Sequence, residues 1–334
     1  IARGIANHMF DVDPPDSKDL ETRIRQTEFS LGIEYDVRQK DAIREFFSRS
    51  VMVLNGGPGT GKTTVVRAIL SIARSLYPDM VIQLAAPTGR AAKRLAALSD
   101  NDARTIHSLL RWNLEENTFA KGPSDLLECQ ILIIDESSMI DTHLFASLIL
   151  ALPDDCRLLL IGDEDQLESV GPGRVFQDLI DSGRIPAVHL ERIWRQSEGS
   201  GIITLAREIR DEETCTWEDG VTYLDLPEER ILDAILEDVD PEMDPDRFQV
   251  LAPMYKGAAG IEAVNEALQN VFNPPRAGCP ELTAGPVTFR KNDKVMLLKN
   301  MPDEDVFNGD MGVISGIDSR TRTITVDFGE TEVD

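Results

Sequence analysis

The sequence predicts an α/β protein whose core is a parallel β-sheet covered by helices on both faces. Short runs of almost entirely apolar residues recur along the first half of the chain, at 51–54, 81–85, 131–134 and 157–161. Stretches with helical character, 63–76 and 91–98, lie between these runs. A strand of a parallel sheet is buried on both faces and is therefore apolar throughout, whereas a half-exposed strand alternates. Strands and helices are thus expected in alternation.

The 334 residues suffice for two domains, because single cores usually stop growing at about 250–300 residues. After residue 195 a helix is expected at 202–209, a strand at 248–254 and a helix at 261–271, which predicts a second, partial α/β domain. From about residue 286 the hydrophobic period changes to two, which predicts a small antiparallel β unit with strands at 294–298, 311–317 and 321–328. Residues 111–127 interrupt the first domain and are expected to form an inserted hairpin or loop. The predicted division is a flank at 1–30, a first domain at 31–195, a second at 196–285 and the β unit at 286–334.

The charge balance is strongly acidic. Lys and Arg number 34 against 59 Asp and Glu, which gives a formal net charge of −25. A general nucleic-acid binder normally has a basic footprint, so the whole-chain balance argues against that class. The acidity is uneven, however, because residues 211–246 hold 15 acidic residues and one arginine. We expect this stretch to form an outer face of the second domain, away from any loops that bind phosphate or nucleic acid.

Composition excludes several other classes. No run of 18 apolar residues could span a membrane, and no charged start followed by an apolar core marks a signal peptide. The four cysteines and four histidines are scattered without a CxxC pair, so neither a zinc site nor a disulfide framework is expected. Reduced cysteines favour a cytoplasmic protein. The first residue is Ile1 rather than Met, which suggests a piece of a longer protein.

A glycine-rich loop follows the first expected strand and precedes a helix. Residues 56–63, GGPGTGKT, fit the pattern GxxxxGK[ST], whose backbone N–H groups surround phosphate oxygens. Lys62 would reach the β- and γ-phosphates of ATP, and Thr63 would bind Mg²⁺. The alternative is a glycine-rich turn that arose by chance. The candidate nucleotide contacts are Gln39, Gly57, Pro58, Gly59, Thr60, Gly61, Lys62, Thr63 and Thr64.

Two adjacent carboxylates follow the apolar run 131–134. The strand would place Asp135 next to the metal ion, and Glu136 could polarise the attacking water. This pairing suits hydrolysis rather than storage of a nucleotide. A plain capped strand is the alternative interpretation.

At this point the chain resembles the superfamily 1 DNA helicases, specifically their RecD-like branch. Asp135–Met139 is similar to that family's DExSM box, and residues 162–173 to its GDxxQLPSVGPG box, with Glu168 in place of proline. Further similarities are the PTGRAA loop at 87–92, Thr105-Ile106-His107, Trp194-Arg195-Gln196, the stretch 251–274, and 307–312 of an SH3-like insert. The resemblance implies a P-loop RecA-like parallel-sheet motor domain, a partial second RecA-like domain and the start of an SH3-like insert. The family's last two boxes would lie beyond Asp334.

The resemblance also implies roles for three polar residues. Gln39 would read the adenine edge, and Gln166 would sense the γ-phosphate. Arg195, at the junction of the two α/β halves, would neutralise the phosphate as a catalytic arginine when the cleft closes. Each residue has a simpler alternative, because Gln39 and Gln166 could be ordinary glutamines and Arg195 a surface arginine.

A locally basic segment provides the expected DNA contacts. Hydroxyls, backbone amides and arginines can bind phosphates without reading sequence. Trp112, Trp194 and Phe119 could stack on bases, although aromatic residues near apolar runs more often belong to the core. His107 could equally be a half-buried structural histidine, and the resemblance gives 111–127 the position of a strand-separating pin. The candidate DNA-binding residues are Pro87, Thr88, Gly89, Arg90, Lys93, Thr105 and His107.

The expected function is that of an ATP-dependent DNA helicase in recombination and repair. By resemblance it would track single-stranded DNA 5′ to 3′, use ATP and Mg²⁺, meet duplex ends, and associate with partner subunits of a recombination–repair complex. One alternative is a P-loop ATPase switch that does not unwind DNA. Another is a DNA-binding fragment without turnover.

Overall fold

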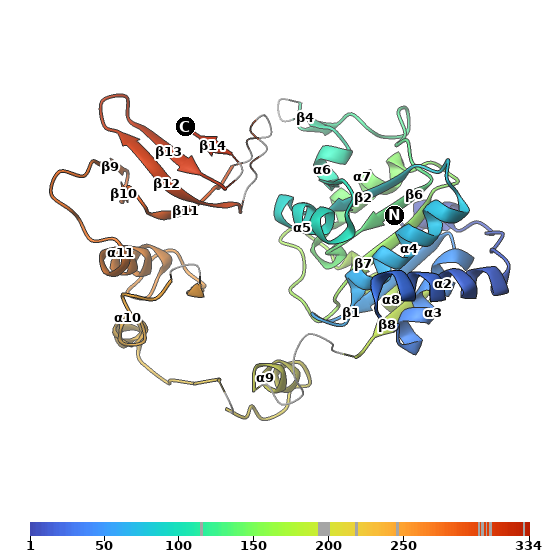
Figure 1. The fold of residues 1–334 in the computed structure, drawn as a ribbon, viewed down its shortest axis with the longest axis horizontal. Coiled ribbons are helices and arrows are strands. Elements are labelled where there is room, and N and C mark those ends of the chain that lie inside the picture. Colours follow the sequence, from blue (N-terminus) through green and yellow to red (C-terminus); the bar gives the residue numbers. More distant parts are fainter. Residues whose placement is uncertain are drawn as a thin grey trace. The chain divides into compact units, whose positions relative to one another are not determined.

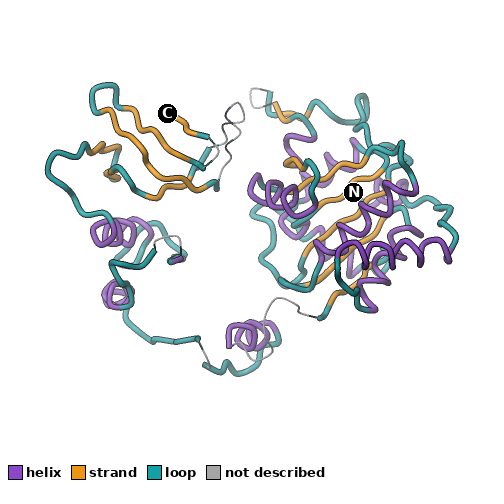
Figure 2. The backbone as a smooth tube through the Cα atoms, viewed as in Figure 1, coloured by secondary structure: helices purple, strands orange, loops and turns teal. Residues whose placement is uncertain are grey.

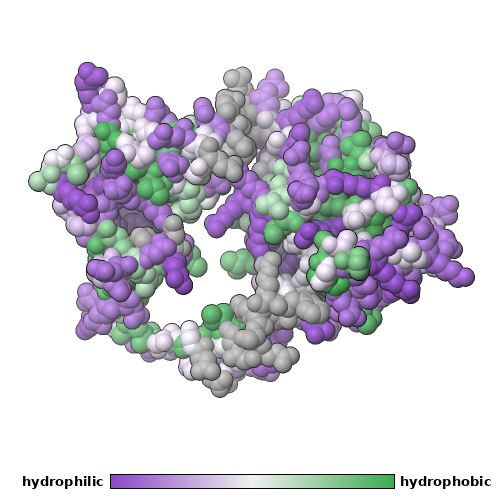
Figure 3. Space-filling view, viewed as in Figure 1, coloured by the Kyte–Doolittle hydropathy of each residue, from purple (hydrophilic) through white to green (hydrophobic). Residues whose placement is uncertain are grey.

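The computed structural model describes residues 1–113, 116–192, 201–217, 220–244, 247–299, 301, 304, 306, 309–329 and 331–334. The chain divides into two compact units, Ile1–Gly220 and Val221–Asp334 (Figure 1). Hydrophilic side chains cover most of the face of each unit that Figure 3 shows, as expected for a chain with a net charge of −25. The structure contains no helix, among the described residues, that is long and apolar enough to cross a membrane. The predicted domain boundaries remain a prediction.

The first unit is built on a six-stranded sheet in the order β3-β2-β6-β7-β1-β8. All neighbouring strands in it run parallel, which confirms the predicted sheet. Each expected apolar run forms a strand, and β3 and β8 are additional. The strands are β1 (Val51–Gly56), β2 (Ile82–Ala86), β3 (Ala103–Thr105), β6 (Ile131–Ile134), β7 (Arg157–Gly162) and β8 (Ala187–Leu190).

Alternate residues of the central strands pack into two separate hydrophobic cores, one on each face of the sheet. Val51 and Val53 of β1 pack into one core, and Met52 and Leu54 pack into the other. The first core includes residues of α1 (Ala2–His8), α6 (Ile106–Leu109), α7 (Thr142–Ala151) and α8 (Val175–Asp181). The second includes residues of α2 (Ser17–Leu31), α3 (Val37–Ser48), α4 (Lys62–Leu76) and α5 (Gly89–Ser99). Helices therefore cover both faces of the sheet (Figure 1).

Helix α4 shows how the sequence fixes an element beside the site. Val65, Ile69 and Ile72 recur at helical spacing and are buried against the sheet. The helix ends at Leu76, because Pro78 disfavours helical backbone at the residue before it. Its first turn then lies at the carboxyl end of β1.

The interruption at 111–127 contains a short antiparallel hairpin, as predicted. Its strands are β4 (Trp112–Asn113) and β5 (Thr118–Phe119). The rings of Trp112 and Phe119 lie 4.6 Å apart, and the His107 ring lies 5.9 Å and 5.7 Å from them. Phe119 also packs against the first core. These aromatic residues therefore anchor the base of the hairpin. The third stacking candidate, Trp194, lies outside the described residues.

The second unit contains the predicted antiparallel β unit (Figure 2). Its four-stranded sheet has the order β11-β12-β13-β14, and a separate hairpin pairs β9 with β10. The elements are α10 (Glu228–Glu237), α11 (Ile261–Phe272), β9 (Glu281–Ala284), β10 (Val287–Arg290), β11 (Lys294–Met296), β12 (Met311–Asp318), β13 (Thr323–Asp327) and β14 (Glu332–Val333). The expected helix at 202–209 is α9 (Gly201–Arg210), which clusters with the first unit.

The strand predicted at 248–254 is wrong. These residues form no strand in the structure, and Leu251 and Met254 are 87% and 64% exposed. The described part of the second unit offers no parallel sheet that this segment could join. Instead, the carbonyl of Met254 accepts a hydrogen bond from the backbone N–H of Ile261 at 2.9 Å, and that of Tyr255 accepts one from Glu262 at 3.1 Å. The segment thus satisfies donors at the start of α11.

Candidate functional site: a nucleotide pocket at the carboxyl edge of the sheet

The glycine-rich loop joins β1 to α4 and needs glycine at particular positions. Gly59 and Gly61 have φ angles of +82° and +89°, a region that other residues enter only with strain. Gly56 passes so close to β8 that a Cβ atom there would lie 2.9 Å from the Leu190 carbonyl oxygen. Because α4 begins at Lys62, its first N–H groups are unpaired within the helix and can bind phosphate.

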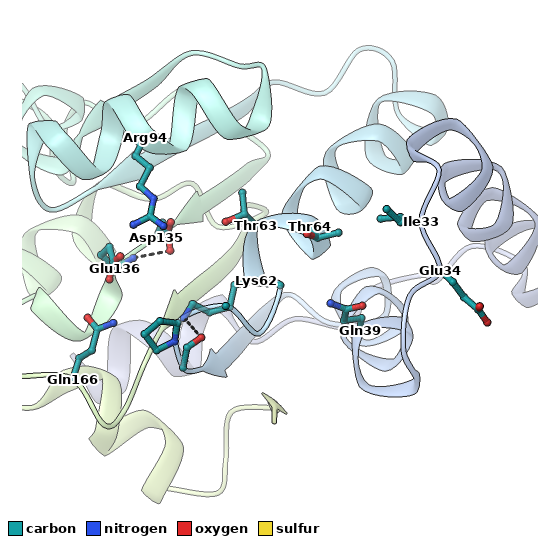
Figure 4. Close-up of a pocket in the computed structure, with 14 residues that line it drawn as sticks. Ile33, Glu34, Gln39, Lys62, Thr63, Thr64, Arg94, Asp135, Glu136 and Gln166 are labelled. Carbon is teal, nitrogen blue, oxygen red and sulfur yellow. Dashed lines mark hydrogen bonds between the residues drawn. The ribbon is translucent and has the colours of Figure 1, made fainter. Parts of the chain in front are cut away.

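A cavity of about 480 Å³ lies beside this loop. That volume falls within the usual range for small-molecule sites. Figure 4 shows the first turn of α4 in the middle, with residues preceding and opening α3 on one side and the acidic pair on the other. The lining residues are Ile33, Glu34, Gln39, Gly57, Pro58, Gly59, Gly61, Lys62, Thr63, Thr64, Arg94, Asp135, Glu136 and Gln166.

Most of the predicted nucleotide contacts therefore meet in one cavity. Thr60 differs from the other predicted loop residues, because its side chain is buried and does not line the cavity. Its hydroxyl donates to the Gly57 carbonyl oxygen at 2.8 Å. Thr60 thus stabilises the loop from inside, and the sequence pattern alone does not separate this role from direct contact.

The ammonium group of Lys62 is held inside the loop. It donates to the carbonyl oxygens of Gly56 and Gly57, the latter at 3.2 Å. Burial lowers the pKa of Lys62, and the negative charges of Asp163, Asp135 and Glu136 oppose that shift. A phosphate group would supply further negative charge where the lysine is most desolvated.

The acidic pair stands at the end of β6. The backbone N–H of Asp135 donates to the Ala85 carbonyl of the neighbouring strand at 3.0 Å, which fixes its position. The Asp135 carboxylate accepts a hydrogen bond from the Glu136 N–H at 2.9 Å, and Glu136 adopts the left-handed conformation at φ +53°. Such a conformation is uncommon for a residue other than glycine and is frequent at functional sites.

Burial raises the pKa of both carboxyl groups. For Asp135, the Glu136 N–H and the charges of Lys62 and Arg94 oppose the rise. For Glu136, the charge of Asp135 adds to burial, and Lys62 and Arg94 again oppose it. Two desolvated carboxylates side by side disfavour ionisation, so the pocket has a deficit of positive charge at this end.

The residues present fit a magnesium ion. The Thr63 hydroxyl and the Asp135 carboxylate line the same cavity, and both are the hard oxygen ligands that Mg²⁺ prefers. The raised pKa of Asp135 shows a buried carboxylate whose charge is incompletely compensated, and a divalent cation would compensate it. No cluster of three or more His, Cys, Asp or Glu that could hold a metal occurs among the described residues. The two predicted ligands would therefore share the ion with other oxygen donors.

Gln166 reaches the cavity from the loop after β7. Its side-chain amide donates to the Asp163 carboxylate at 3.3 Å, and its backbone N–H donates to the Asp163 carbonyl at 3.2 Å. Asp163 is only 3% exposed. The sequence prediction missed this positioning role of Asp163, although an acidic residue directly after a buried strand was a usable signal.

Gln39 lines the other end of the cavity, where its amide has two partners. The side-chain oxygen accepts from the Asp36 N–H at 3.1 Å, and the Asp36 carboxylate accepts from the Gln39 N–H at 2.7 Å. This reciprocal capping box starts α3. The amide nitrogen donates to the Thr60 carbonyl oxygen at 3.3 Å, so Gln39 also holds the phosphate loop. Its contact with adenine stays a prediction.

Arg94 lines this pocket, although the sequence placed it only within the basic segment expected to hold DNA. It lies on α5, and its side chain points toward Asp135 (Figure 4). The sequence offered only the basic character of this helix, which suggested a DNA-facing surface. The predicted catalytic Arg195 lies outside the described residues.

The predicted DNA contacts gather at the neighbouring strand ends. Ala86 of β2 pairs with Thr105 of β3, so the loops that follow these strands lie side by side. Thr88 caps α5 by accepting from the Ala91 N–H at 3.2 Å, and Thr105 caps α6 by accepting from the Ser108 N–H at 3.1 Å. The structure places the seven candidates, Pro87, Thr88, Gly89, Arg90, Lys93, Thr105 and His107, on these two loops and the helices they start.

Two of these candidates differ in charge state. The side chain of Arg90 is exposed and carries a positive charge. Partial burial lowers the pKa of His107, and Asp141 opposes the shift. The neutral imidazole that burial favours can still offer a hydrogen bond to a phosphate. The aromatic rings of Trp112 and Phe119 beside it also support the alternative that His107 is a half-buried structural histidine.

Comparison with known proteins identifies the family. Residues 34–224 match the family described as an AAA domain, and residues 264–328 match the ATP-dependent RecD-like DNA helicase SH3 domain. The ATP-dependent RecD2 DNA helicase of Deinococcus radiodurans is 33% identical over 299 residues, which are 87% of this chain and 39% of that protein. The RecBCD enzyme subunit RecD of Mycolicibacterium smegmatis is 27% identical over 345 residues, which are 90% of this chain and 60% of that protein. The chain thus spans less than two thirds of each relative.

A solved structure supports the same fold. The crystal structure of Bacteroides Pif1 bound to ssDNA matches with a TM-score of 0.54 and 19% identity, over 90% of this chain and 74% of that chain. The parallel sheet, the phosphate loop at the end of β1 and the acidic pair at the end of β6 fit this likeness. The chain belongs to the AAA-domain family, and it is similar to the RecD-like DNA helicases over most of its length.

Proposed function

We propose that this chain is the nucleotide-hydrolysing part of an ATP-dependent motor that moves on single-stranded DNA and unwinds duplexes. The observation that carries the proposal is one cavity at the carboxyl edge of the sheet that joins the phosphate loop, the acidic pair and Gln166. A nucleotide-storage protein needs the loop but not a second carboxylate or a loop amide in the same cavity.

Each residue of the cavity has a separate role in the proposed hydrolysis. Lys62 and the first N–H groups of α4 bind the phosphates, and Glu136 accepts a proton from the attacking water. Thr63 and Asp135 would hold Mg²⁺, which when bound withdraws negative charge from the phosphate oxygens. Gln166 orients toward the terminal phosphate and, through the loop after β7, reports its presence to the rest of the domain.

The DNA contacts follow from the neighbouring strands. Because β2 lies between β3 and β6, the loop at 87–90 stands between the Thr105 loop and Asp135. Hydroxyls, helix N-termini and arginines there suit the phosphate backbone of single-stranded DNA. By the family resemblance, Arg195 at the junction of the two predicted domains would neutralise the negative charge of the phosphate.

Three finer points belong to the same proposal. Movement 5′ to 3′ is proposed from the family resemblance, as is the action of the hairpin β4–β5 as a strand-separating pin. The name of the RecD relative supports association with partner subunits of a recombination–repair complex. The free thiols of the cysteines support a cytoplasmic location, and a position near the nucleoid is proposed because DNA is the proposed track.

The test is the steady-state ATPase rate with and without an oligo(dT) strand, for the wild type and Lys62→Ala. We expect hydrolysis that single-stranded DNA stimulates and that the substitution abolishes, with an unchanged circular dichroism spectrum. Hydrolysis that ignores DNA would refute the motor and leave the ATPase switch. DNA binding without ATP hydrolysis would refute the motor and support the alternative of a DNA-binding fragment without turnover.

A further inference from the structure

We infer that Arg94 contacts the terminal phosphate of the bound nucleotide, so that helix α5 serves the nucleotide pocket as well as the DNA-facing loop. This inference rests on the proposed function and names a phosphate contact that the sequence pattern did not. The arginine comes from the same domain as the phosphate loop, so its contact does not depend on closure of a cleft.

The position of Arg94 along the cavity indicates which part of the nucleotide it meets. Gln39 lies on one side of the phosphate loop, and Asp135, Glu136 and Arg94 lie on the other (Figure 4). A nucleotide whose base lies on the side of Gln39 and whose phosphates follow Lys62 would end beside the acidic pair. Arg94 therefore stands at the terminal-phosphate end.

The geometry of this end places a cation beside the terminal phosphate. Two partly buried carboxylates, Asp135 and Glu136, line the space where the γ-phosphate would sit. Arg94 lines the same cavity as Lys62, and its side chain points toward Asp135 (Figure 4). A planar guanidinium can bind two phosphate oxygens at once, which an ammonium cannot.

Helix α5 holds Arg94 in place. Ala92 and Leu95 are buried and fix the helix on the sheet, while Arg94 lies on its outward side. Thr88 caps the N-terminus of the same helix, within the loop proposed to meet DNA. Arg90 and Arg94 are one helical turn apart. A shift of this short helix on DNA binding would thus move the guanidinium relative to the terminal phosphate.

The decisive measurement is the affinity for ATP and for ADP without DNA, by isothermal titration calorimetry with Mg²⁺ present. A contact with the terminal phosphate is absent from ADP, so Arg94→Ala should weaken ATP binding at least about tenfold and leave ADP binding within about twofold. Arg94→Lys should recover only part of the lost ATP affinity, because lysine keeps the positive charge but lacks the paired N–H donors of the guanidinium. Arg49→Ala is the matched control, since it removes an exposed arginine next to the far end of α3.

Each outcome separates the inference from the function on which it rests. Equal weakening of ATP and ADP by Arg94→Ala, or no weakening, would overturn the phosphate contact even if DNA stimulates the wild-type ATPase. If Arg94→Ala weakens ATP binding alone, while DNA fails to stimulate the wild-type ATPase, the phosphate contact of Arg94 is supported and the motor is refuted. A wild-type chain that binds neither nucleotide would overturn both. Unchanged thermal unfolding of the variants, expected for an exposed side chain, excludes misfolding as the cause.

Discussion

A buried amide between the phosphate loop and the Gln166 loop gives the sharpest stability prediction. Asn55, the residue before Gly56 in β1, is 4% exposed. Its side-chain oxygen accepts from the Glu164 N–H at 3.0 Å, and its amide nitrogen donates to the Glu164 carboxylate at 2.5 Å. The amide nitrogen also lies 3.0 Å from Nδ1 of His189 in β8. Asn55→Leu keeps the branched shape and the number of side-chain heavy atoms and removes these bonds.

The magnitude follows from the kinds of bond lost. A neutral hydrogen bond contributes about 1 kcal/mol and one to a charged group about 1.5–3 kcal/mol, which together give about 2.5–4 kcal/mol. The Glu164 side chain is 28% exposed, so water replaces part of the loss, and we expect about 2 kcal/mol. For a unit of this size that lowers Tm by about 4–8 °C.

Thermal unfolding at pH 7, followed by circular dichroism, measures the effect. Glu164→Gln is the matched control, because it keeps the backbone donor and an acceptor oxygen, and it should change Tm by less than half as much. The double variant Asn55→Leu, Glu164→Ala should lose less than the sum of the single changes, since both remove the same bonds. A Tm shift below about 1 °C for Asn55→Leu, or strict additivity, would refute the reasoning.

Three further predictions concern the site itself. Glu136→Gln should abolish turnover but keep nucleotide binding, and it should raise Tm at pH 7. Burial raises the pKa of Glu136 above its ordinary 4.5, so the wild type loses stability as the pH rises through the pKa of the folded state. The gain in Tm of the variant should therefore vanish near pH 4 in unfolding scans. Thr88→Ala removes the cap of α5 and should cost about 1 kcal/mol in urea unfolding and weaken oligo(dT) binding by fluorescence anisotropy, and unchanged values in both assays would contradict the cap. Gly59→Ala forces alanine into a left-handed conformation and should cost about 1–2 kcal/mol and reduce ATP affinity in calorimetry, whereas an unchanged affinity would show that the loop tolerates a side chain there.

The sequence predicted the sheet well because burial on both faces leaves a direct signal. The run 131–134 is apolar at every position, and in the structure its residues alternate between the two cores. The segment 248–254 is also mostly apolar but contains Gln249 and Pro253, and it forms no strand, because a strand also needs neighbouring strands with free hydrogen-bonding groups. In this segment apolar composition predicted neither burial nor pairing, because Leu251 and Met254 are exposed.

The candidate site was predictable to the extent that its residues end strands. Lys62, Asp135 and Gln166 follow three neighbouring strands of a parallel sheet, whose carboxyl ends meet at one edge, so strand order alone brings them together.

Strand order could not predict the role of Arg94, because this residue belongs to a helix and lies on the side that helical periodicity assigns to solvent. The outward side of α5 borders the cavity, and a long guanidinium side chain reaches into it. Periodicity distinguishes core from surface, but only the three-dimensional arrangement distinguishes a surface that faces a cavity from one that faces bulk water. Helical spacing assigns Arg94 to solvent, whereas the position of α5 beside the cavity assigns it to the nucleotide pocket.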